Sequence, residues 1–328
     1  MSENWREVAN RVRNWGKWGD TDQIGTLNYI TPEKIVAASG LVKRGRSFPL
    51  CAPFEADGPW SNSFFRRNPI RLMVVHGGDE QIADHLEKGF GGSVGQAFKS
   101  LYQGPMRFAD DVIVMNLQSG TQWDALSHVW YDHQLYNGYP ASAVTGLGTT
   151  KNGIEKVAER GQIVTRGVLL DVARKNGLKH LAPNTVVTPE ELDATSRAQD
   201  ITVEQGDVVL VRTGWWGRFV ESRDGGAFLA GSPGLSWRCA EWLHDKKVAA
   251  VAVDNVAVEV SPAEIEDTPL LLHMLTLREM GLMLGEIWAL DELGADCAQD
   301  KIYEFMLVAQ PLLIPGAVGS PVAPVAIK

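Results

Sequence analysis

Cysteine is scarce in this 328-residue sequence, which contains three cysteines and has no CxxC motif or Cys/His tract. The three, Cys51, Cys239 and Cys297, lie far apart in the chain. They offer no disulfide framework, and their spacing excludes a structural zinc cluster built on cysteine pairs. So few cysteines are typical of a reducing compartment, and we expect a cytoplasmic protein.

Long hydrophobic runs and surplus positive charge are missing as well. The longest apolar runs, such as 248–253, are far shorter than the roughly 20 residues of a membrane span, and residues 1–14 lack the apolar stretch of a signal peptide. Lys and Arg number 31 against 40 Asp and Glu, and basic residues form no run longer than a pair such as Arg66-Arg67. We therefore expect a small-molecule substrate as partner, and neither a membrane nor a nucleic acid.

The sequence does contain a regular alternation of short apolar runs and helix signals. Four β-branched runs predict buried strands, at 111–117, 167–171, 207–212 and 248–254. Helix starts are predicted at Thr31 and Thr188, helix ends at Gly40 and Gly161, and helical spacing occurs over 236–244 and 270–284. This alternation predicts an α/β fold with a mixed or largely parallel sheet. We interpret 1–328 as one domain with an N-terminal extension (about 1–50), and 56–104 as loops and short helices laid over its core.

The segment 117–128 is the most informative part of the chain. It follows a predicted buried strand, turns at Ser119-Gly120 and is expected to enter a helix near Thr121. On that helix Asp124 and His128 would lie four residues apart on one face, where a carboxylate can orient an imidazole for acid–base catalysis. The alternative is that Asp124 only caps the helix and His128 is a packed histidine.

His273 and Glu286 form a second candidate pair. His273 interrupts a Leu-rich helical pattern, and Glu286 opens an apolar run in which a bare buried charge would be costly. Taken alone, His273 is interpreted as a packed core histidine and Glu286 as a solvated strand end. Polar residues at three other strand ends are interpreted as ordinary turn residues: Asp171, Arg212-Thr213 and Asp254-Asn255.

Seven blocks of the sequence occur in an order shared with a known family. They are WGDTDQIGTLN (18–28), TPE (31–33), GTQWDALSH (120–128), YNG (136–138), RGVLLD (166–171), VRTGW (211–215) and the segment 273–286. With these blocks the chain resembles the cyclase family of metal-dependent hydrolases, which includes bacterial kynurenine formamidases and isatin hydrolases.

This resemblance implies a swivelling β/α/β fold, with a mixed sheet flanked by helices, in homodimers or homotetramers. In the family, two histidines and an aspartate of a His-x-Gly-Thr-His-x-Asp motif bind Mn²⁺ or Zn²⁺. A histidine four residues later is the acid/base, and a later His and Glu complete the site. Asp124 matches the metal-binding aspartate, His128 the acid/base, and His273 and Glu286 the later pair.

Gln118 and Gln122 occupy the two positions where the family has histidine. A glutamine offers a neutral carbonyl oxygen, and such a ligand suits Mn²⁺ or Mg²⁺ better than Zn²⁺. The resemblance thus implies a divalent ion, Mn²⁺ or Zn²⁺, held weakly by Asp124, Gln118, Gln122 and Glu286. Alternatively, both glutamines hydrogen-bond a substrate carbonyl in a pocket without metal.

Three functions stay open at this point. The first is hydrolysis of a small amide, cyclic amide or lactone by a metal-activated water, with His128 as acid/base and with Trp123 and Trp215 contacting the substrate beside the two glutamines. The second is a metal-independent isomerase, dehydratase or cyclase that uses His128 for proton transfer. The third is a non-catalytic ligand-binding protein on the same fold. The chain keeps four ionisable residues at positions of the family's site: Asp124, His128, His273 and Glu286. A site without catalytic activity has no chemical reason to keep all four, so we expect an enzyme, and of the two enzymes the hydrolase.

Overall fold

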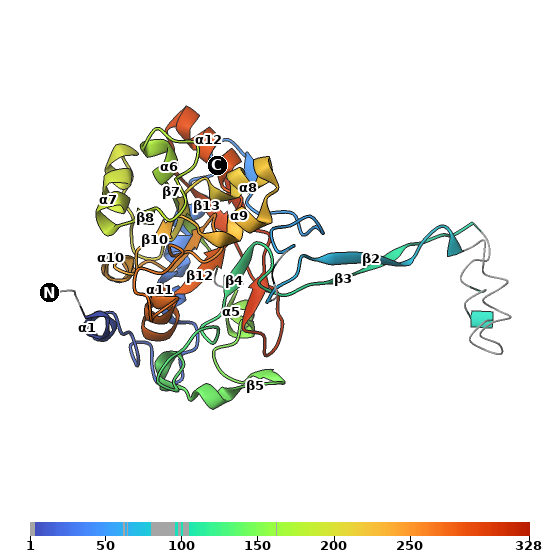
Figure 1. Ribbon diagram of the computed structural model, residues 1–328, viewed down its shortest axis with the longest axis horizontal. Helices are drawn as coiled ribbons and strands as arrows, with labels where there is room; N and C mark the ends of the chain where they lie inside the picture. Colours follow the sequence, from blue (N-terminus) through green and yellow to red (C-terminus); the bar gives the residue numbers. More distant parts are fainter. Residues whose placement is uncertain are drawn as a thin grey trace.

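A nine-stranded mixed sheet forms the centre of the computed structural model, which describes residues 4–61, 63, 65–79, 96–97, 100, 105–161 and 163–328. The strand order is β1-β15-β13-β7-β9-β11-β12-β4-β14, and helices flank the sheet (Figure 1). Strands β7, β9, β11 and β12 are parallel neighbours, whereas the strands on either side of them pair antiparallel. The bounds are β1 Ser47–Pro49, β4 Gln122–Asp124, β7 Val164–Asp171, β9 Val208–Arg212, β11 Ala250–Val253, β12 Met283–Glu286, β13 Glu304–Val308, β14 Gly319–Pro321 and β15 Val325–Ile327.

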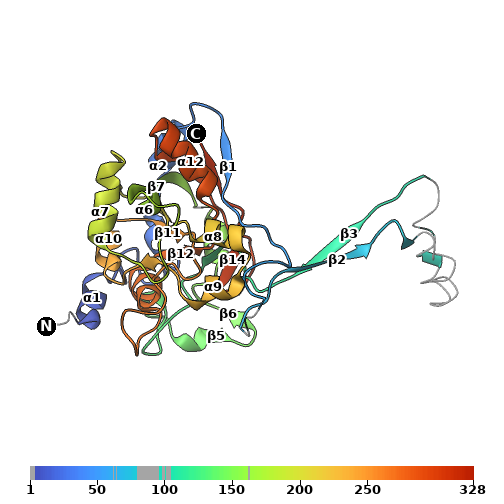
Figure 2. The same ribbon diagram turned by 45° about the horizontal axis from the view of Figure 1, so that its top comes forward.

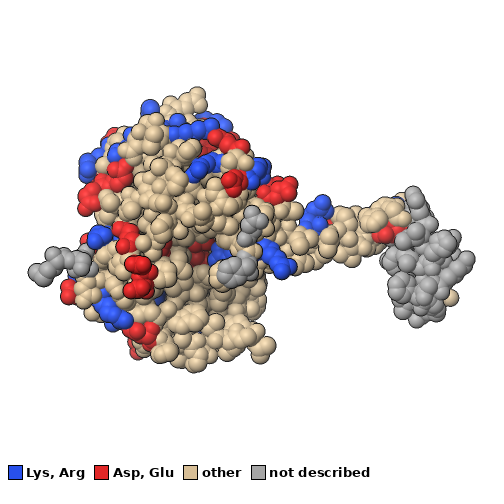
Figure 3. Space-filling view, in the orientation of Figure 1, with Lys and Arg blue, Asp and Glu red and all other residues tan. Residues whose placement is uncertain are grey.

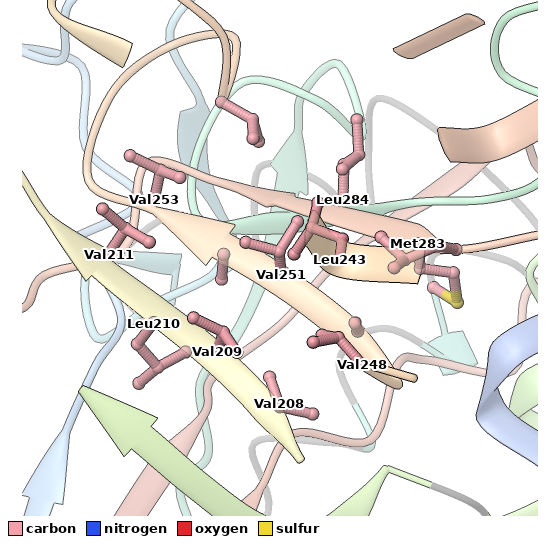
Figure 4. Close-up of a cluster of buried hydrophobic side chains, with 14 of the residues drawn as sticks. Val208, Val209, Leu210, Val211, Leu243, Val248, Val251, Val253, Met283 and Leu284 are labelled. Carbon is pink, nitrogen blue, oxygen red and sulfur yellow. The ribbon is translucent and has the colours of Figure 1, made fainter. Parts of the chain in front are cut away.

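The parallel strands are buried because they lie in the middle of the sheet. Every residue of β9 and β11 is buried, as a run covered on both faces requires. Figure 4 shows their valines and leucines packing together with Met283 and Leu284 of β12. The strands predicted at 167–171, 207–212 and 248–254 are therefore confirmed, and with them the mixed α/β fold.

The helices begin and end largely where the sequence predicts. Thr31 and Thr188 accept hydrogen bonds from Lys34 and Glu191 as N-caps, and Gly161 ends its helix in the left-handed conformation. The α-helices are α1 Trp5–Arg11, α2 Pro32–Ser39, α5 Glu155–Arg160, α6 Val172–Lys175, α7 Pro189–Ala198, α8 Trp215–Ser222, α9 Gly225–Ala230, α10 Cys239–Asp245, α11 Leu271–His273 and α12 Asp291–Asp300. The other helical turns are η1 Gly25–Tyr29, η2 Tyr136–Gly138, η3 Ala141–Ala143 and the π-helical η4 Met274–Met280. None of the described helices combines the length and the apolar character needed to cross a bilayer.

One predicted buried strand is exposed. The run predicted at 111–117 forms β3 (Asp110–Val114), whose one partner among the described strands is β2 (Ile70–Val75). Both strands project from the body as an arm (Figures 1 and 2), and all five residues of β3 are exposed. The predicted burial is wrong because an apolar run does not say whether another layer covers it. The placement of 56–104 over the core is also wrong for β2, and much of that stretch lies outside the described residues.

Two helix predictions fail near the site. No helix begins at Thr121, because Gln122, Trp123 and Asp124 form strand β4 between β12 and β14. The helix predicted over 270–284 ends at Met280, after which Gly281 adopts a left-handed conformation (φ 68°) and β12 begins. In both cases long-range strand pairing satisfies the backbone, and the local pattern does not encode that pairing. The remaining short strands form two-residue pairs: β5 Val144–Thr145 with β6 Gly148–Thr149, and β8 Val186–Val187 with β10 Gly234–Leu235.

The polar strand ends do more than form turns. Arg212, at the end of β9, donates to Asp171 at the end of β7 (2.8 Å) and to Asp291 on α12 (2.7 Å). Asp254, after β11, accepts hydrogen bonds from the backbone and hydroxyl of Thr213 and from the backbone N–H of Gly214. The turn interpretation is corrected accordingly, since these buried groups join neighbouring strands.

Candidate functional site

The register between β12 and β4 gathers three polar side chains at one end of the sheet. Glu286 lies directly opposite Gln122, and Asp124 follows two residues later on the same face of β4. The Gln122 amide nitrogen donates to Glu286 Oε2 (2.6 Å) and lies 3.4 Å from Asp124 Oδ1. All three side chains are buried. Glu286 ends a strand as the sequence predicts, but it is not the solvated residue of that interpretation.

His128 reaches the same group from the turn that follows β4. Its Nε2 atom lies 3.8 Å from Asp124 Oδ1, and its side chain retains 20% exposure. The predicted pairing of Asp124 with His128 is therefore present, although it arises from a strand and a turn instead of a helix face. Because the ring is partly open to solvent, it can exchange protons with a bound molecule.

His273 joins the group from α11, and Glu259 contacts the side of its ring that faces away from the group. Its Nδ1 atom is 2.6 Å from Glu259 Oε1, which leaves Nε2 facing Glu286 Oε1 at 3.3 Å and Asp124 Oδ2 at 3.7 Å. Glu259 also accepts hydrogen bonds from the backbone N–H groups of Leu272 and His273. This buried carboxylate fixes the ring orientation, as partners of metal-binding histidines do.

Burial and charge act in opposite directions on these groups. Burial raises the pKa of Asp124, and the charge of Glu286 adds to that effect. Burial also works against ionisation of Glu286, but the hydrogen bond with His273 and the charge of Arg66 outweigh it and lower the pKa of Glu286. For His273, the carboxylates of Glu259 and Glu286 overcome burial and raise the pKa to about 10. Two neighbouring carboxyls thus have pKa values displaced in opposite directions, as is common at functional sites.

A cavity of about 450 Å³ opens onto this group. Its lining combines aromatic and aliphatic side chains with polar ones: Trp60, Ser63, Phe65, Arg66, Asn116, Gln118, His128, Val256, Ala257, Leu270, His273 and Glu286. Arg66 donates to the backbone oxygen of Gln118 (2.8 Å), lies 3.6 Å from Glu286 and covers the ring of Trp60. The volume and the mixed lining suit a small organic molecule.

The structure brings together most of the predicted site residues. Asp124, His128, His273, Glu286, Gln118 and Gln122 all lie in the buried group or on the cavity wall. Trp123 points to the opposite face of β4, packs on Trp288 and donates to the Ala309 carbonyl oxygen. Trp215 lies in a separate core cluster and donates to the Phe228 carbonyl oxygen. Neither tryptophan lines the cavity, so their predicted contact with substrate is not supported.

Three residues of the site escaped the sequence reasoning. Glu259 follows the strand end at Asp254-Asn255, and that position was the one signal that could have identified it. Arg66 and Asn116 lie just outside β2 and β3, on the two sides of the arm. Nothing local distinguishes Arg66 from other arginines, since only the tertiary fold brings it near Glu286.

The donor set fits a divalent cation. Ligand atoms of Asp124, His273 and Glu286 lie within 4.8 Å of one another, which makes them a candidate metal-binding group among the described residues. Within this group, two buried oxygens, Asp124 Oδ2 and Gln122 Oε1, have no hydrogen-bond partner in the part of the chain that the structure describes. A metal ion here would be held by Asp124, His273 and Glu286, and the Gln122 carbonyl oxygen would join them only if the amide exchanged its oxygen and nitrogen and gave up its hydrogen bond to Glu286. Carboxylate and imidazole are ligands that both Zn²⁺ and Mn²⁺ accept, whereas an amide oxygen suits Mn²⁺ better than Zn²⁺.

The fold and site place this chain among α/β proteins that carry a polar site at the carboxyl ends of parallel strands. The model of the Cyclase family ("Putative cyclase") matches residues 49–260, and the chain belongs to this family.

Solved structures agree with this assignment. A crystal structure of a novel cyclase is 41% identical to this chain, with a TM-score of 0.84 over 97% of this chain and 100% of that chain. Isatin hydrolase A from Ralstonia solanacearum is 20% identical, with a TM-score of 0.60 over 90% and 97% of the two chains. A predicted metal-dependent hydrolase from Bacillus stearothermophilus is 16% identical, with a TM-score of 0.51 over 86% and 97%. The two more distant structures share the fold. No curated protein matches the chain.

Proposed function

We propose that this chain is a hydrolase that cleaves a C–N or C–O bond in a small amide, cyclic amide or lactone. The observation that carries the proposal is the convergence of Asp124, His273 and Glu286 within 4.8 Å, beside a cavity lined by His128. A divalent ion, when bound by these three residues with Gln122, supplies Lewis acidity toward a carbonyl group. The names of the isatin hydrolase and metal-dependent hydrolase structures give the proposal further support.

His128 is the proposed acid/base of the reaction. A water oxygen adds to the carbonyl carbon, and the imidazole of His128 accepts the proton that this water loses. As the C–N or C–O bond breaks, the imidazole returns the proton to the leaving nitrogen or oxygen, and the other product is a carboxylic acid. Asp124 Oδ1, 3.8 Å from Nε2, holds the imidazole in place between these two steps. Gln118 and Asn116 on the cavity wall can hydrogen-bond the substrate.

Metal analysis tests the role of the ion. We expect the purified protein to contain about one Mn²⁺ or Zn²⁺ per chain by elemental mass spectrometry, because the donor set supplies at least three ligands. Dialysis against a chelator should abolish turnover across a panel of amides and lactones, and the same ion should restore it. Asp124→Asn should lose both metal and turnover, whereas Asp193→Asn, on the distant helix α7, should keep both.

A second function is favoured by one feature of the site. The Gln122 amide donates to Glu286, and Arg66 lies 3.6 Å from the same carboxylate, so the protein supplies its own compensation of the buried negative charge. A metal-independent isomerase, dehydratase or cyclase would use His128 for proton transfer in this arrangement. Turnover that survives complete removal of metal would support this function and contradict the metal-dependent one.

Glu259→Gln tests whether orientation of His273 matters. Glutamine keeps the shape of the side chain and one acceptor oxygen, but it removes the charge that faces Nδ1 at 2.6 Å. Loss of such a partner typically lowers metal affinity or activity by about 10–100-fold, and we expect an effect in this range on kcat and on metal affinity measured by competition with a chelating dye. The matched control is Glu264→Gln, which removes a carboxylate bonded to Ser236 and Trp237 away from the cavity. Equal effects of the two substitutions would contradict the role of Glu259.

A further inference from the structure

Asn255 is a polar residue with no exposed surface, and its side chain bonds the backbone that carries Glu259. Charged side chains of both signs lie over the visible face of the body (Figure 3), where water satisfies their polar atoms. Asn255 lies inside, two residues after β11, so its amide must find partners within the protein. The amide nitrogen donates to the backbone oxygens of Pro233 (2.7 Å), Val258 (3.3 Å) and Glu259 (3.3 Å). These bonds tie the turn before Glu259 to the segment before β10.

The turn that Asn255 bonds is strained. The Glu259 backbone N–H donates to the carbonyl oxygen of Ala257, two residues back, so Val258 is the middle residue of a three-residue turn. Val258 has a φ of 56°, and turns of this hand are rare and strained. A β-branched residue is poorly suited to this left-handed conformation, which glycine, asparagine and aspartate adopt far more readily. The turn therefore persists only because the surrounding contacts impose it.

Apolar residues in the left-handed conformation occur next to three parts of the site. Among the described residues, twelve other than glycine have a positive φ, and only three of these are apolar: Val258, Leu270 and Ile287. The first precedes Glu259, the second lies at the start of the helix that carries His273, and the third follows Glu286. Strained backbone is concentrated at functional sites, where it is part of how side chains are held in place. This distribution indicates that the three turns serve the site.

Asn255 connects two of these three positions. Its side chain bonds the carbonyl oxygen of Val258, and its own carbonyl oxygen accepts the N–H of Ile287 (2.8 Å). The turns next to Glu259 and Glu286 are thus tied to one residue. The side-chain oxygen of Asn255 is buried without a partner among the described residues, which costs free energy. A side chain that is kept in spite of this cost is one whose N–H donors matter.

We propose that Asn255 is a positioning residue, which fixes the backbone of Glu259 and thereby the direction in which His273 faces the site. This inference rests on the proposed function, in which His273 and Glu286 hold a divalent ion. Asn255 does not line the cavity, so it acts only through its neighbours. The carboxylate of Glu259 lies 2.6 Å from His273 Nδ1, so a displaced Glu259 backbone turns the imidazole away from the position that an ion requires.

Asn255→Ala tests the proposal through metal affinity, measured by competition of Mn²⁺ or Zn²⁺ with a chelating dye. The variant loses all three side-chain bonds, but the Leu235 N–H still donates to the Val258 oxygen (3.0 Å), so the chain should fold with a loosened turn. We expect about a 10-fold loss of affinity, the lower end of the range for residues that orient metal ligands. Asn255→Ser keeps one donor and should lose less affinity, and it takes the place of the alanine variant if that variant does not fold.

Asn152→Ala is the matched control. Asn152 is also buried, its amide nitrogen donates to the Tyr136 carbonyl oxygen (2.9 Å), and its side-chain oxygen likewise has no partner among the described residues. It does not line the cavity, so its loss should lower the thermal unfolding temperature and leave metal affinity unchanged. Equal losses of affinity in the two alanine variants would contradict the proposal, because general loosening would then explain both.

Two further outcomes separate this inference from the proposed function. Wild-type affinity in a folded Asn255→Ala variant would overturn the positioning role and leave the hydrolase proposal standing. A wild-type protein that binds no metal would instead contradict the metal-dependent function, and crystal structures of the metal-free proteins would then decide the role of Asn255. The variant should show Val258 outside the left-handed conformation or Glu259 displaced from His273, and an unchanged turn would overturn the proposal.

Discussion

Replacing His128 with alanine is expected to lower turnover by about 10²–10⁴-fold, the range that a positioned acid/base contributes. The imidazole lines the cavity, its Nε2 atom lies 3.8 Å from Asp124, and alanine removes both proton transfers of the proposed reaction. The fold should tolerate the change, because this ring is partly exposed and a substitution at such a position usually alters the free energy of unfolding by little. Steady-state kinetics on the amide or lactone found by screening, with thermal unfolding of the same samples, gives both quantities.

His244→Ala provides the control for this experiment. His244 is a half-buried histidine on α10 whose Nδ1 atom contacts Asp245, and it does not line the cavity. Its removal should leave turnover within a factor of two or so, since surface substitutions away from a site change little. If His128→Ala also left turnover unchanged, His128 would have no part in the mechanism and the proposed reaction would need another acid/base.

The sequence could identify the chemical groups of the site but not the way they meet. The spacing of Asp124 and His128 predicts a shared helix face, whereas in the structure the two residues meet because a short strand leads into a tight turn. Glu286 reaches Gln122 through strand register, which depends on residues more than 160 positions apart in the chain. Tertiary contacts also bring Glu259 and Arg66 into the site: the sequence marks Glu259 only by its position after a strand end, and it does not distinguish Arg66 from other arginines.

For the fold, whether the predicted burial of an apolar run was correct depended on where that run lies in the sheet. The apolar runs that became β9 and β11 are central, so a run covered on both faces was the right interpretation. The run that became β3 is equally apolar, but it pairs with one partner outside the main sheet and stays exposed. Apolar composition therefore predicts a strand in both cases, whereas burial depends on which elements pack around it. Helix starts were predicted well because their capping interactions are local.

Arg212→Ala is expected to lower the free energy of unfolding by about 3–5 kcal/mol, the usual result of removing one partner from a buried ion pair. The guanidinium has 5% exposure and joins three segments, since it donates to Asp171 after β7, to Asp291 on α12 and to the Lys179 carbonyl oxygen. Alanine leaves the carboxylate of Asp171, which is 1% exposed, without its buried counter-charge. Urea unfolding followed by circular dichroism measures the difference.

Arg174→Ala tests whether the cost comes from the burial of the ion pair or from the loss of any ion pair with Asp171, because Arg174 contacts the same carboxylate. Its Nε atom lies 3.1 Å from Asp171 Oδ2, but its side chain is 45% exposed, so solvent screens the pair and its loss should cost about 0–1 kcal/mol. Arg212→Met with Asp171→Asn should recover part of the lost free energy of unfolding, since it removes both charges and asparagine can still cap α6.

An equal loss of unfolding free energy for Arg174→Ala and Arg212→Ala would mean that the buried network does not hold the strand ends together. A large cost for Arg212→Ala alone would show that these polar strand ends stabilise the sheet edge on which the site is built.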